Sequence, residues 1–334
     1  MVYGLWSSHS PYLSPVFYGL LKLYARLAIR IYCKKIIIDK PSLLKQDGPL
    51  LLACNHPNSF LDGMILTTLF DHPVHSLARG DAFKKRWMDR FLRSLQLLPV
   101  YRTSEGVENL EHNYTTFASC IEAFKENGIV LIFSEGRCEN EWHLRPLKKG
   151  TARLAIAAWK ENIPLTVVPT ALNYSSFRKF GKEVHLYFGD PIRKDGVIGE
   201  DSEGKQLLAF NQQLYDQLKK MVYEIKPDEK QKRRKLFGIR LQPIAWLLAL
   251  PAIAGWLLHA PLFYPVKIFA ELRFRNSGHY DSVLTSLLLI LYPLYLVLLA
   301  FLAYTIDARL IIAALFIAPL TAWCCVQAKY GADL

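Results

Sequence analysis

The order of hydrophobic and polar positions divides the chain into an amphipathic segment, an alternating middle and an apolar final third. Between residues 17 and 34, basic side chains recur every four positions, and apolar side chains occupy the opposite face of a helix. The basic set is Lys22, Arg26, Arg30 and Lys34, and the apolar set is Phe17, Leu20, Tyr24, Leu27 and Ile31. This pattern predicts an amphipathic helix, which either lies in a membrane interface or packs on a folded domain.

From residue 48 to about residue 227, short apolar runs alternate with segments of helical period. The runs PLLLACN, IVLIFSEG, IPLTVVPTALNY and VHLYFGDPI predict buried strands, and NLEHNYTTFASCIEAFKENG and KKGTARLAIAAWKEN predict helices. Strands that alternate with helices predict an α/β fold, with a mostly parallel sheet flanked by helices. Functional residues are then expected in the loops that follow the strands.

Three runs after residue 240 contain no Asp, Glu, Lys or Arg: 241–266, 282–306 and 310–328. Each is long enough to cross a hydrocarbon core of about 30 Å as a helix that rises about 1.5 Å per residue. Prolines interrupt the first run, so a kinked, re-entrant or interfacial helix is the alternative to a crossing there. Only three residues separate the other two runs, which predicts a helical hairpin.

These patterns predict four parts of the chain. We expect an N-terminal amphipathic membrane-interface segment (1–47), an α/β domain (48–227), a basic linker (228–240) and a C-terminal region with two or three transmembrane helices (241–334). The linker contains KQKRRK, and basic residues beside a membrane span favour the cytoplasmic side. The pattern therefore predicts a multi-pass membrane protein whose α/β domain faces the cytoplasm.

Composition favours lipid over nucleic acid as the partner of this chain. Hydrophobic residues make up 51% of it, and its net charge is +12. Such a charge suits anionic lipid or nucleic acid, but no zinc-finger or RNA-binding signature accompanies it. The six cysteines include no Cys-x-x-Cys pair, so we expect neither a disulfide framework nor a metal site.

The clearest candidate for chemistry is LLACNHPNSFLDG, residues 51–63, in which a strand-like run ends at Asn55 and His56. Pro, Asn and Ser form a turn that lifts the imidazole out of the sheet. Asp62 can then accept a hydrogen bond from Nδ1, which leaves Nε2 free to act as a base. A purely structural histidine is the alternative. No Gly-x-Ser-x-Gly elbow is present to supply a covalent nucleophile.

Further candidates stand at the ends of other predicted strands and helices. LLPVYR ends at Arg102, whose guanidinium can bind phosphate or form a surface ion pair. IFSEGR brings Glu135, which can bind a hydroxyl, and Gly136, where the backbone can approach a ligand. Lys148 and Lys149 precede a helix start, which suits either an anion or a solvated surface. VVPTALNY offers the least chemistry.

Together these blocks resemble the glycerophospholipid acyltransferase family, the PlsC-type 1-acylglycerol-3-phosphate acyltransferases. That family has an Asn-His-x4-Asp block, a strand ending in Arg, a Phe-Pro-Glu-Gly-Thr-Arg block and a later Val-Pro strand. NHPNSFLD, LLPVYR, FSEGR and VVPTALNY follow the same order, KKGTARLA looks like the family's lysine-glycine helix start, and the resemblance covers roughly residues 20–195. Five residues instead of four separate His56 from Asp62, Ser134 replaces the usual proline, and Arg137 comes one place early.

The resemblance implies a glycerol-3-phosphate acyltransferase-like fold and a membrane-bound O-acyltransferase of phospholipid biosynthesis. By resemblance, His56 deprotonates an acceptor hydroxyl, Asp62 orients His56, and the alkoxide attacks the thioester of acyl-CoA or acyl-carrier protein. The transfer is direct and needs no cofactor or metal. The residues implied in substrate binding are Asn55, Glu135 and Gly136, together with the cations Arg102, Arg137, Lys148 and Lys149, which suit the acceptor phosphate.

Several acceptors fit this reading of the sequence. The first is 1-acylglycerol-3-phosphate, whose acylation gives phosphatidic acid, and the alternatives are glycerol-3-phosphate and a phosphate-free lyso-lipid. A non-catalytic lipid-binding membrane protein on the same fold is an alternative of another class. The presence of both His56 and Asp62 argues against it, because a scaffold does not need a poised base.

Overall fold

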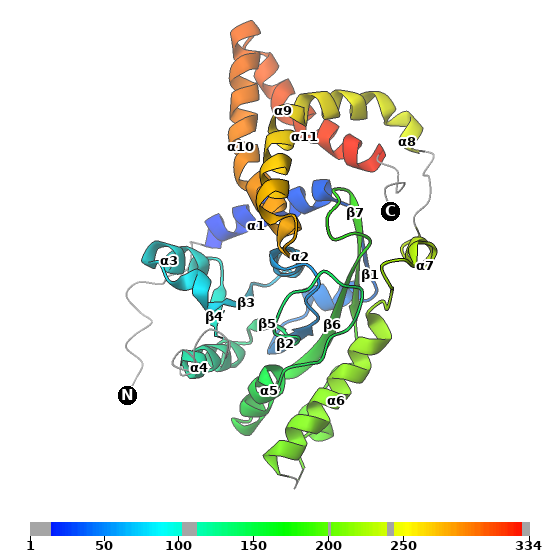
Figure 1. Ribbon diagram of the computed structural model, residues 1–334. Helices are drawn as coiled ribbons and strands as arrows, with labels where there is room; N and C mark the ends of the chain where they lie inside the picture. The colour runs from blue at the N-terminus through cyan, green and yellow to red at the C-terminus, as the bar shows by residue number, and fades with distance from the viewer. Residues whose placement is uncertain (1–14, 102–111, 200–201, 239–243, 329–334) are drawn as a thin grey trace.

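The computed structural model describes residues 15–101, 112–199, 202–238 and 244–328, and it joins an α/β domain to a group of long helices (Figure 1). A seven-stranded sheet forms the centre of the domain, in the order β1-β7-β6-β2-β5-β3-β4. The strands are β1 (Cys33–Ile38), β2 (Leu50–Cys54), β3 (Val74–Arg79), β4 (Leu97–Val100), β5 (Ile129–Phe133), β6 (Thr166–Tyr174) and β7 (Lys182–Phe188). Neighbours pair in parallel except β6 and β7, which are antiparallel. The predicted mostly parallel sheet is confirmed.

Helices cover both faces of the sheet, and side-chain alternation along β2 shows how the core divides between them. Leu51 and Ala53 belong to one core layer, and Leu50, Leu52 and Cys54 to the other, because successive strand residues point to opposite faces. The first layer lies under α4 (His112–Lys125), α5 (Gly150–Lys160) and α6 (Glu203–Met221), and the second under α1 (Pro15–Tyr32) and α2 (Phe60–Leu69). Two shorter helices are α3 (Arg86–Ser94) and α7 (Lys230–Leu236). Both layers isolate β2 from water, as its fully apolar sequence requires.

The amphipathic helix α1 is present, and two of its basic residues, Lys22 and Arg26, contact the segment around the end of α2, whereas Arg30 is exposed. Lys22 donates to the carbonyls of Asp71 and His72, at 3.1 and 3.2 Å, just after α2 ends. Leu23 and Leu27 on another side of α1 are more than half exposed. The helix therefore packs on the domain, and with its exposed leucines its place in a membrane interface stays a prediction.

The N-terminal segment is not confined to that helix, which corrects the boundary expected at residue 47. The helix ends at Tyr32, and Cys33–Ile38 forms edge strand β1, paired in parallel with β7. Lys34 therefore lies on a strand, although it continues the four-residue spacing of the basic face. The β-branched run Ile36 to Ile38 favours a strand, and the edge of the sheet was available to it.

The final third of the chain contains α8 (Ile244–Leu247), α9 (Ala249–Phe274), α10 (Tyr280–Ile306) and α11 (Leu310–Ala328). Within the described residues, three helices, α9 to α11, are long and apolar enough to cross a membrane. Figure 1 shows α10 rising away from the α/β domain, with α11 returning beside it and α9 curving across both. The hairpin predicted for α10 and α11 is present.

The first apolar helix differs from the predicted span. Where the sequence predicts a span over 241–266, α9 begins at Ala249 and continues through Lys267 to Phe274. Lys267 and Glu271 lie one turn apart at 3.7 Å, and such an i,i+4 pair stabilises a helix beyond the charge-free window. Pro261 and Pro265 lie inside α9 and accompany its curvature in Figure 1, because proline removes a helical hydrogen bond.

Candidate active site

The candidate site lies at the carboxyl end of the sheet, where the neighbouring parallel strands β2 and β5 stop. Cys54 and Phe133 are partners in the register, so the residues that follow them, including His56 and Glu135, meet at the same edge. Asn55 secures the third strand there: its side chain donates to the Leu172 carbonyl at 3.0 Å and accepts from the Leu172 amide at 2.8 Å. Asn55 is 3% exposed, so the observed contacts are structural, and substrate binding by this residue stays a prediction.

The structure brings His56 and Asp62 together. Nδ1 of His56 lies 2.9 Å from Oδ2 of Asp62, and the Phe133 ring stacks on the imidazole with centroids 3.8 Å apart. The carboxylate accepts from Nδ1–H, which keeps the lone pair on Nε2, and the stacking holds the plane of the ring. The His56 side chain is 15% exposed and that of Asp62 is fully buried. The His56 imidazole is therefore accessible as a base, while the Asp62 carboxylate that orients it is shielded from solvent.

Two further groups satisfy the buried carboxylate of Asp62. The backbone N–H of Asn58 donates to Oδ2 at 2.8 Å, and the Tyr174 hydroxyl donates to Oδ1 at 2.7 Å. Burial, and then the charge of Asp62, raises the pKa of Tyr174, so this hydroxyl remains a donor. Three donors to one carboxylate fix its position and leave neither of its oxygens without a partner.

The extra residue between His56 and Asp62 is absorbed at the start of α2. Ser59 has a φ of +52°, a region that side chains rarely adopt, and α2 begins at Phe60. The Asp62 amide then donates to the Ser59 carbonyl at 3.2 Å, so Asp62 occupies the first helical turn. The helix dipole favours a carboxylate in this position. The turn returns the acid to the histidine, as the longer spacing requires.

A buried polar cluster connects this turn to the membrane-type helix α10. The Asn58 side chain donates to Oδ2 of Asp281 at 2.7 Å, and Asp281 also binds the Lys182 ammonium and the Tyr32 hydroxyl. The side chains of Lys182 and Asp281 are both fully buried. We name these four residues, Tyr32, Asn58, Lys182 and Asp281, the docking cluster. Ser282 adds a hydroxyl that donates to the Asn58 carbonyl at 3.1 Å.

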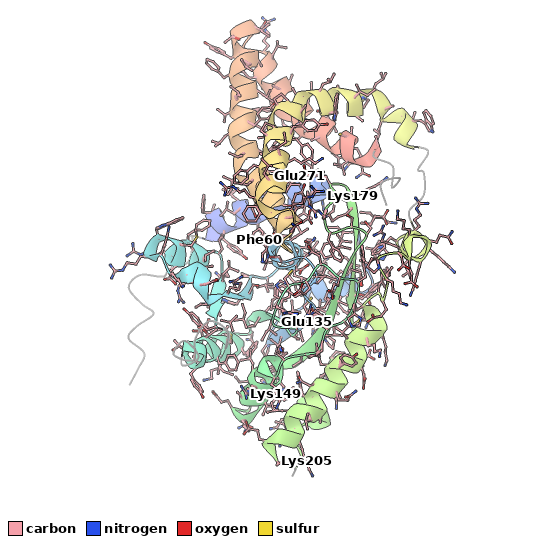
Figure 2. All side chains as sticks on the ribbon, in the orientation of Figure 1. Phe60, Glu135, Lys149, Lys179, Lys205 and Glu271 are labelled. Atoms are coloured by element: carbon pink, nitrogen blue, oxygen red, sulfur yellow. The ribbon has the colours of Figure 1, made fainter. Side chains whose placement is uncertain are left out.

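Glu135 is present at the site, but its carboxylate is occupied by backbone. It is 4% exposed, and its two oxygens accept the amides of His56 and Arg145, each at 3.1 Å. Burial raises the pKa of Glu135 to about 7, although these two amides oppose the shift. In Figure 2, Glu135 marks the end of β5, and Phe60 marks the start of α2 below the tail helices. Glu135 thus braces two loops, and its predicted contact with an acceptor hydroxyl stays a prediction.

The positions of the predicted cations differ among themselves. Arg137 is 58% exposed and pairs with Glu139 at 3.2 Å. Lys148 and Lys149 are exposed before α5, and Figure 2 labels Lys149 there. Arg102 lies outside the described residues. Phosphate binding by these side chains stays a prediction.

At the same edge of the sheet, the backbone conformation and the space around Gly136 both favour glycine. Its φ is +73°, and a Cβ at this position would lie 2.8 Å from the Lys148 side chain. The preceding Ser134, which replaces the family's proline, accepts a hydrogen bond from Thr151 in the first turn of α5 at 3.0 Å. Together these contacts hold the loop after β5 against the start of α5.

Sequence reasoning missed several residues that shape the site. Tyr174 ends the VVPTALNY block, which promised least chemistry, yet it holds Asp62. Arg145 is 19% exposed and lies 3.4 Å from Glu139, so it is a more enclosed cation than Arg137. Only its proximity to the Lys148-Lys149 pair hinted at it. Within the described residues, no group of three His, Cys, Asp or Glu side chains is arranged to hold a metal ion.

Comparisons with known proteins find similarity to acyltransferases. Residues 35–173 match the family model described as "Acyltransferase". The chain is 31% identical over 167 residues to glycerol-3-phosphate O-acyltransferase 2 of Saccharomyces cerevisiae, covering 46% of this chain and 21% of that protein. It is 25% identical over 179 residues to 1-acyl-sn-glycerol-3-phosphate acyltransferase of Bacillus subtilis, covering 53% and 83% respectively.

A solved structure also aligns with the chain. It is the crystal structure of the 1-acyl-sn-glycerophosphate acyltransferase PlsC from Thermotoga maritima, with a TM-score of 0.41 and 14% sequence identity. The alignment covers 61% of this chain and 78% of that one. The match to the yeast relative spans only about a fifth of that relative's length.

Proposed function

We propose, from the match of residues 35–173 to the acyltransferase family model, that the chain is a membrane-bound O-acyltransferase that uses His56 as its general base. The observation that carries the proposal is the 2.9 Å contact between His56 Nδ1 and the buried Asp62 carboxylate. That contact leaves Nε2 as the basic atom at the open end of the sheet. Homology to O-acyltransferases of two kinds supports the same reaction type.

The proposed reaction is a direct acyl transfer. Nε2 of His56 takes the proton of the acceptor hydroxyl as the oxygen attacks the thioester carbonyl. The new ester C–O bond forms, the C–S bond breaks, and the departing thiolate receives the proton from the imidazolium. Asp62, held by Asn58 and Tyr174, stabilises the imidazolium between these two transfers. Because a thiolate is a good leaving group, the proposal needs no metal and no cofactor besides the acyl thioester.

The first proposed acceptor is 1-acylglycerol-3-phosphate, with acyl-CoA or acyl-carrier protein as the donor. The predicted cations, including Lys148 and Lys149 before α5, support an acceptor that carries phosphate. The relative named glycerol-3-phosphate O-acyltransferase makes glycerol-3-phosphate a second candidate acceptor. A phosphate-free lyso-lipid would not supply the phosphate that we propose these cations bind.

The proposed place of the reaction is the cytoplasmic face of a membrane. Three apolar helices and the exposed leucines of α1 support membrane attachment. The basic helix α7, directly before the tail, supports a cytoplasmic α/β domain. Protease digestion of right-side-out and inverted vesicles tests this orientation: cleavage of the α/β domain in right-side-out vesicles alone contradicts it.

One assay tests the function. Purified full-length protein is mixed with labelled acyl-CoA or acyl-carrier protein and with 1-acylglycerol-3-phosphate, glycerol-3-phosphate or a phosphate-free lyso-lipid. We expect ester formation on a phosphorylated acceptor, abolished by His56→Ala and retained by His72→Ala. His72 is a matched control, because it also contacts an aspartate, Asp47, at 3.0 Å, but on the exposed surface. Absence of transfer from either donor by folded protein would favour the non-catalytic lipid-binding alternative.

A further inference from the structure

A cavity of about 450 Å³ lies where the tail helices meet the α/β domain. Its walls come from α1, the β6–β7 turn, α9, α10 and α11, so it exists only because the tail docks on the domain. Apolar side chains form much of it, including Ala28, Ile31, Leu262, Phe263, Leu288 and Val326. The volume lies within the range of about 300–1,000 Å³ that is typical of small-molecule sites, whereas packed interiors contain few voids larger than a water molecule.

The charged residues of this cavity are all cations. Arg178 and Lys179, in the β6–β7 turn, and Lys267 of α9 line it, and none of the described lining residues is Asp or Glu. Both turn cations are exposed. An apolar interior with a cationic rim matches an amphipathic anion. The acyl chain of such a ligand would fill the apolar cavity, and its anionic headgroup would contact the cations.

Contacts with neighbouring residues hold two of the rim cations, Arg178 and Lys267, in place. The Arg178 guanidinium lies 4.4 Å from the Tyr280 ring centroid and donates to the Arg275 carbonyl at 2.7 Å. Lys267 lies 3.7 Å from Glu271, which offsets part of its charge. Figure 2 labels Lys179 and Glu271 at this junction between domain and tail. The Arg178 contacts fix its guanidinium at the rim, and Lys179 follows it in the same turn.

Aromatic side chains indicate the depth of the rim in a membrane. Trp256 and Tyr264 line the cavity and are 49% and 39% exposed, and the indole N–H donates to the tyrosine hydroxyl at 3.0 Å. Tryptophan and tyrosine are enriched at the level of lipid headgroups. Lysine and arginine at the same level contact lipid phosphates. The occupant that fits this depth is a lipid of the surrounding bilayer.

We propose that this cavity binds one anionic phospholipid, with an acyl chain inside and its phosphate at Arg178 and Lys179. The site goes beyond the proposed acyl transfer, because His56 and Asp62 do not line it. Its inner wall includes Tyr32, whose hydroxyl binds Asp281 of the docking cluster. A bound lipid would thus fill the space beside the polar contacts that join α10 to the turn after β2, and would stabilise the docked tail.

Native mass spectrometry of the full-length protein in detergent tests the site directly and needs no acyl thioester. The protein is delipidated and titrated with phosphatidylglycerol, phosphatidylcholine or inorganic phosphate. We expect one phosphatidylglycerol to bind about tenfold more tightly than phosphatidylcholine. Both lipids carry a phosphate, but the choline ammonium of phosphatidylcholine cancels its charge and is repelled by the cationic rim. Inorganic phosphate should neither bind detectably nor compete, because the acyl chain supplies much of the affinity.

Matched variants locate the binding. Arg178→Gln with Lys179→Gln should reduce the preference for phosphatidylglycerol about tenfold, whereas Arg273→Gln, on α9 but not lining the cavity, should leave it unchanged. Leu288→Trp should fill the cavity and reduce binding of both lipids. Leu294→Trp should not, because Leu294 also lies on α10 but is 65% exposed and does not line the cavity.

Three results would overturn the proposal: equal affinity for the two lipids, binding that Leu288→Trp leaves intact, or saturation by inorganic phosphate alone. Should Leu288→Trp disturb folding, the Arg178/Lys179 variant decides by itself. Because lipid binding and acyl transfer are measured separately, an inactive protein that still binds phosphatidylglycerol refutes the proposed function and not this site.

Discussion

The Asn58 side chain donates a 2.7 Å hydrogen bond to the Asp281 carboxylate, which lies 223 residues further along the chain at the start of α10. The Asn58 backbone N–H donates to Asp62 at 2.8 Å. One residue thus links a carboxylate of the tail to the carboxylate that orients His56. The turn between His56 and α2 is supported by the tail as well as by the sheet.

Asp281→Asn should destabilise the protein and weaken the docking of α10. The substitution leaves the fully buried Lys182 ammonium without a counter-charge, a change that costs about 3–5 kcal/mol in comparable buried pairs. We expect a clearly lower Tm in detergent and reduced acyl transfer. Thermal unfolding followed by circular dichroism, with activity measured on the same samples, provides the check.

The matched variant for this test removes both charges. Lys182→Met with Asp281→Asn keeps an amide oxygen that can accept from Asn58 and leaves no isolated charge. Most of the lost stability should return, because a neutral pair avoids the cost of burying ions. If the double variant were as unstable as Asp281→Asn alone, the ion pair would not be the reason for the loss.

His56→Ala should lower kcat at least about 10²- to 10⁴-fold, the usual contribution of general-base catalysis. Asp62→Asn should be impaired as well, because the amide cannot stabilise an imidazolium and can favour the wrong tautomer. The two effects should be far from additive, since the side chains act as one unit at 2.9 Å. Steady-state kinetics of the two single variants and the double variant, with unchanged Tm, measure this coupling. More than about a tenth of wild-type kcat in His56→Ala would exclude the general-base role.

Ser59 allows a test of the unusual spacing between His56 and Asp62. Because its φ is +52°, Ser59→Gly should be tolerated in both activity and Tm, whereas Ser59→Val should cost roughly 1–3 kcal/mol of stability. Ser59→Ala serves as the control, because it removes only the hydroxyl that contacts His279 at 2.8 Å. Deletion of Ser59 restores the common spacing but should inactivate, since α2 would start one residue out of register with His56. An active deletion variant would show that the longer turn is dispensable.

Local patterns predicted most of the fold, and contacts between distant segments account for what they did not predict. The apolar runs of β2 and β5 and the charge-free helices carry their own signal, because burial on both sides or immersion in lipid excludes polar residues. Strand β1 was missed because Lys34 continued a helical spacing, although the run from Ile36 to Ile38 favours a strand and its pairing with β7 completes it. For the site, the His56 and Asp62 pair follows from local spacing. The contributions of Tyr174 and Asp281 depend on tertiary packing and leave no local signature.

Glu135 should make the stability of the protein depend on pH in a defined direction. Its pKa is about 7 in the folded state, raised by burial from a usual value of 4.5. Between pH 4.5 and 7 the folded state therefore holds a proton that the unfolded state has released, so this group lowers the free energy of unfolding as pH rises. Its effect should level off above about pH 8, where the carboxyl is ionised in both states.

Glu135→Gln isolates this contribution. The amide stays neutral at every pH, so the variant should lose the part of the Tm decline between pH 5 and 8 that comes from this carboxyl. Its Tm should be lower at pH 5. The Glu135 carboxyl accepts hydrogen bonds from the backbone N–H groups of His56 and Arg145, and in the variant one of these donors faces the side-chain NH2 group, which cannot accept. Glu139→Gln is the control, since its side chain is 37% exposed and its loss should leave the slope unchanged. Thermal unfolding of the wild type and both variants, measured at intervals from pH 5 to 8.5, compares the slopes. Equal slopes for the wild type and Glu135→Gln would mean that this carboxyl is already ionised at pH 5 in the folded protein.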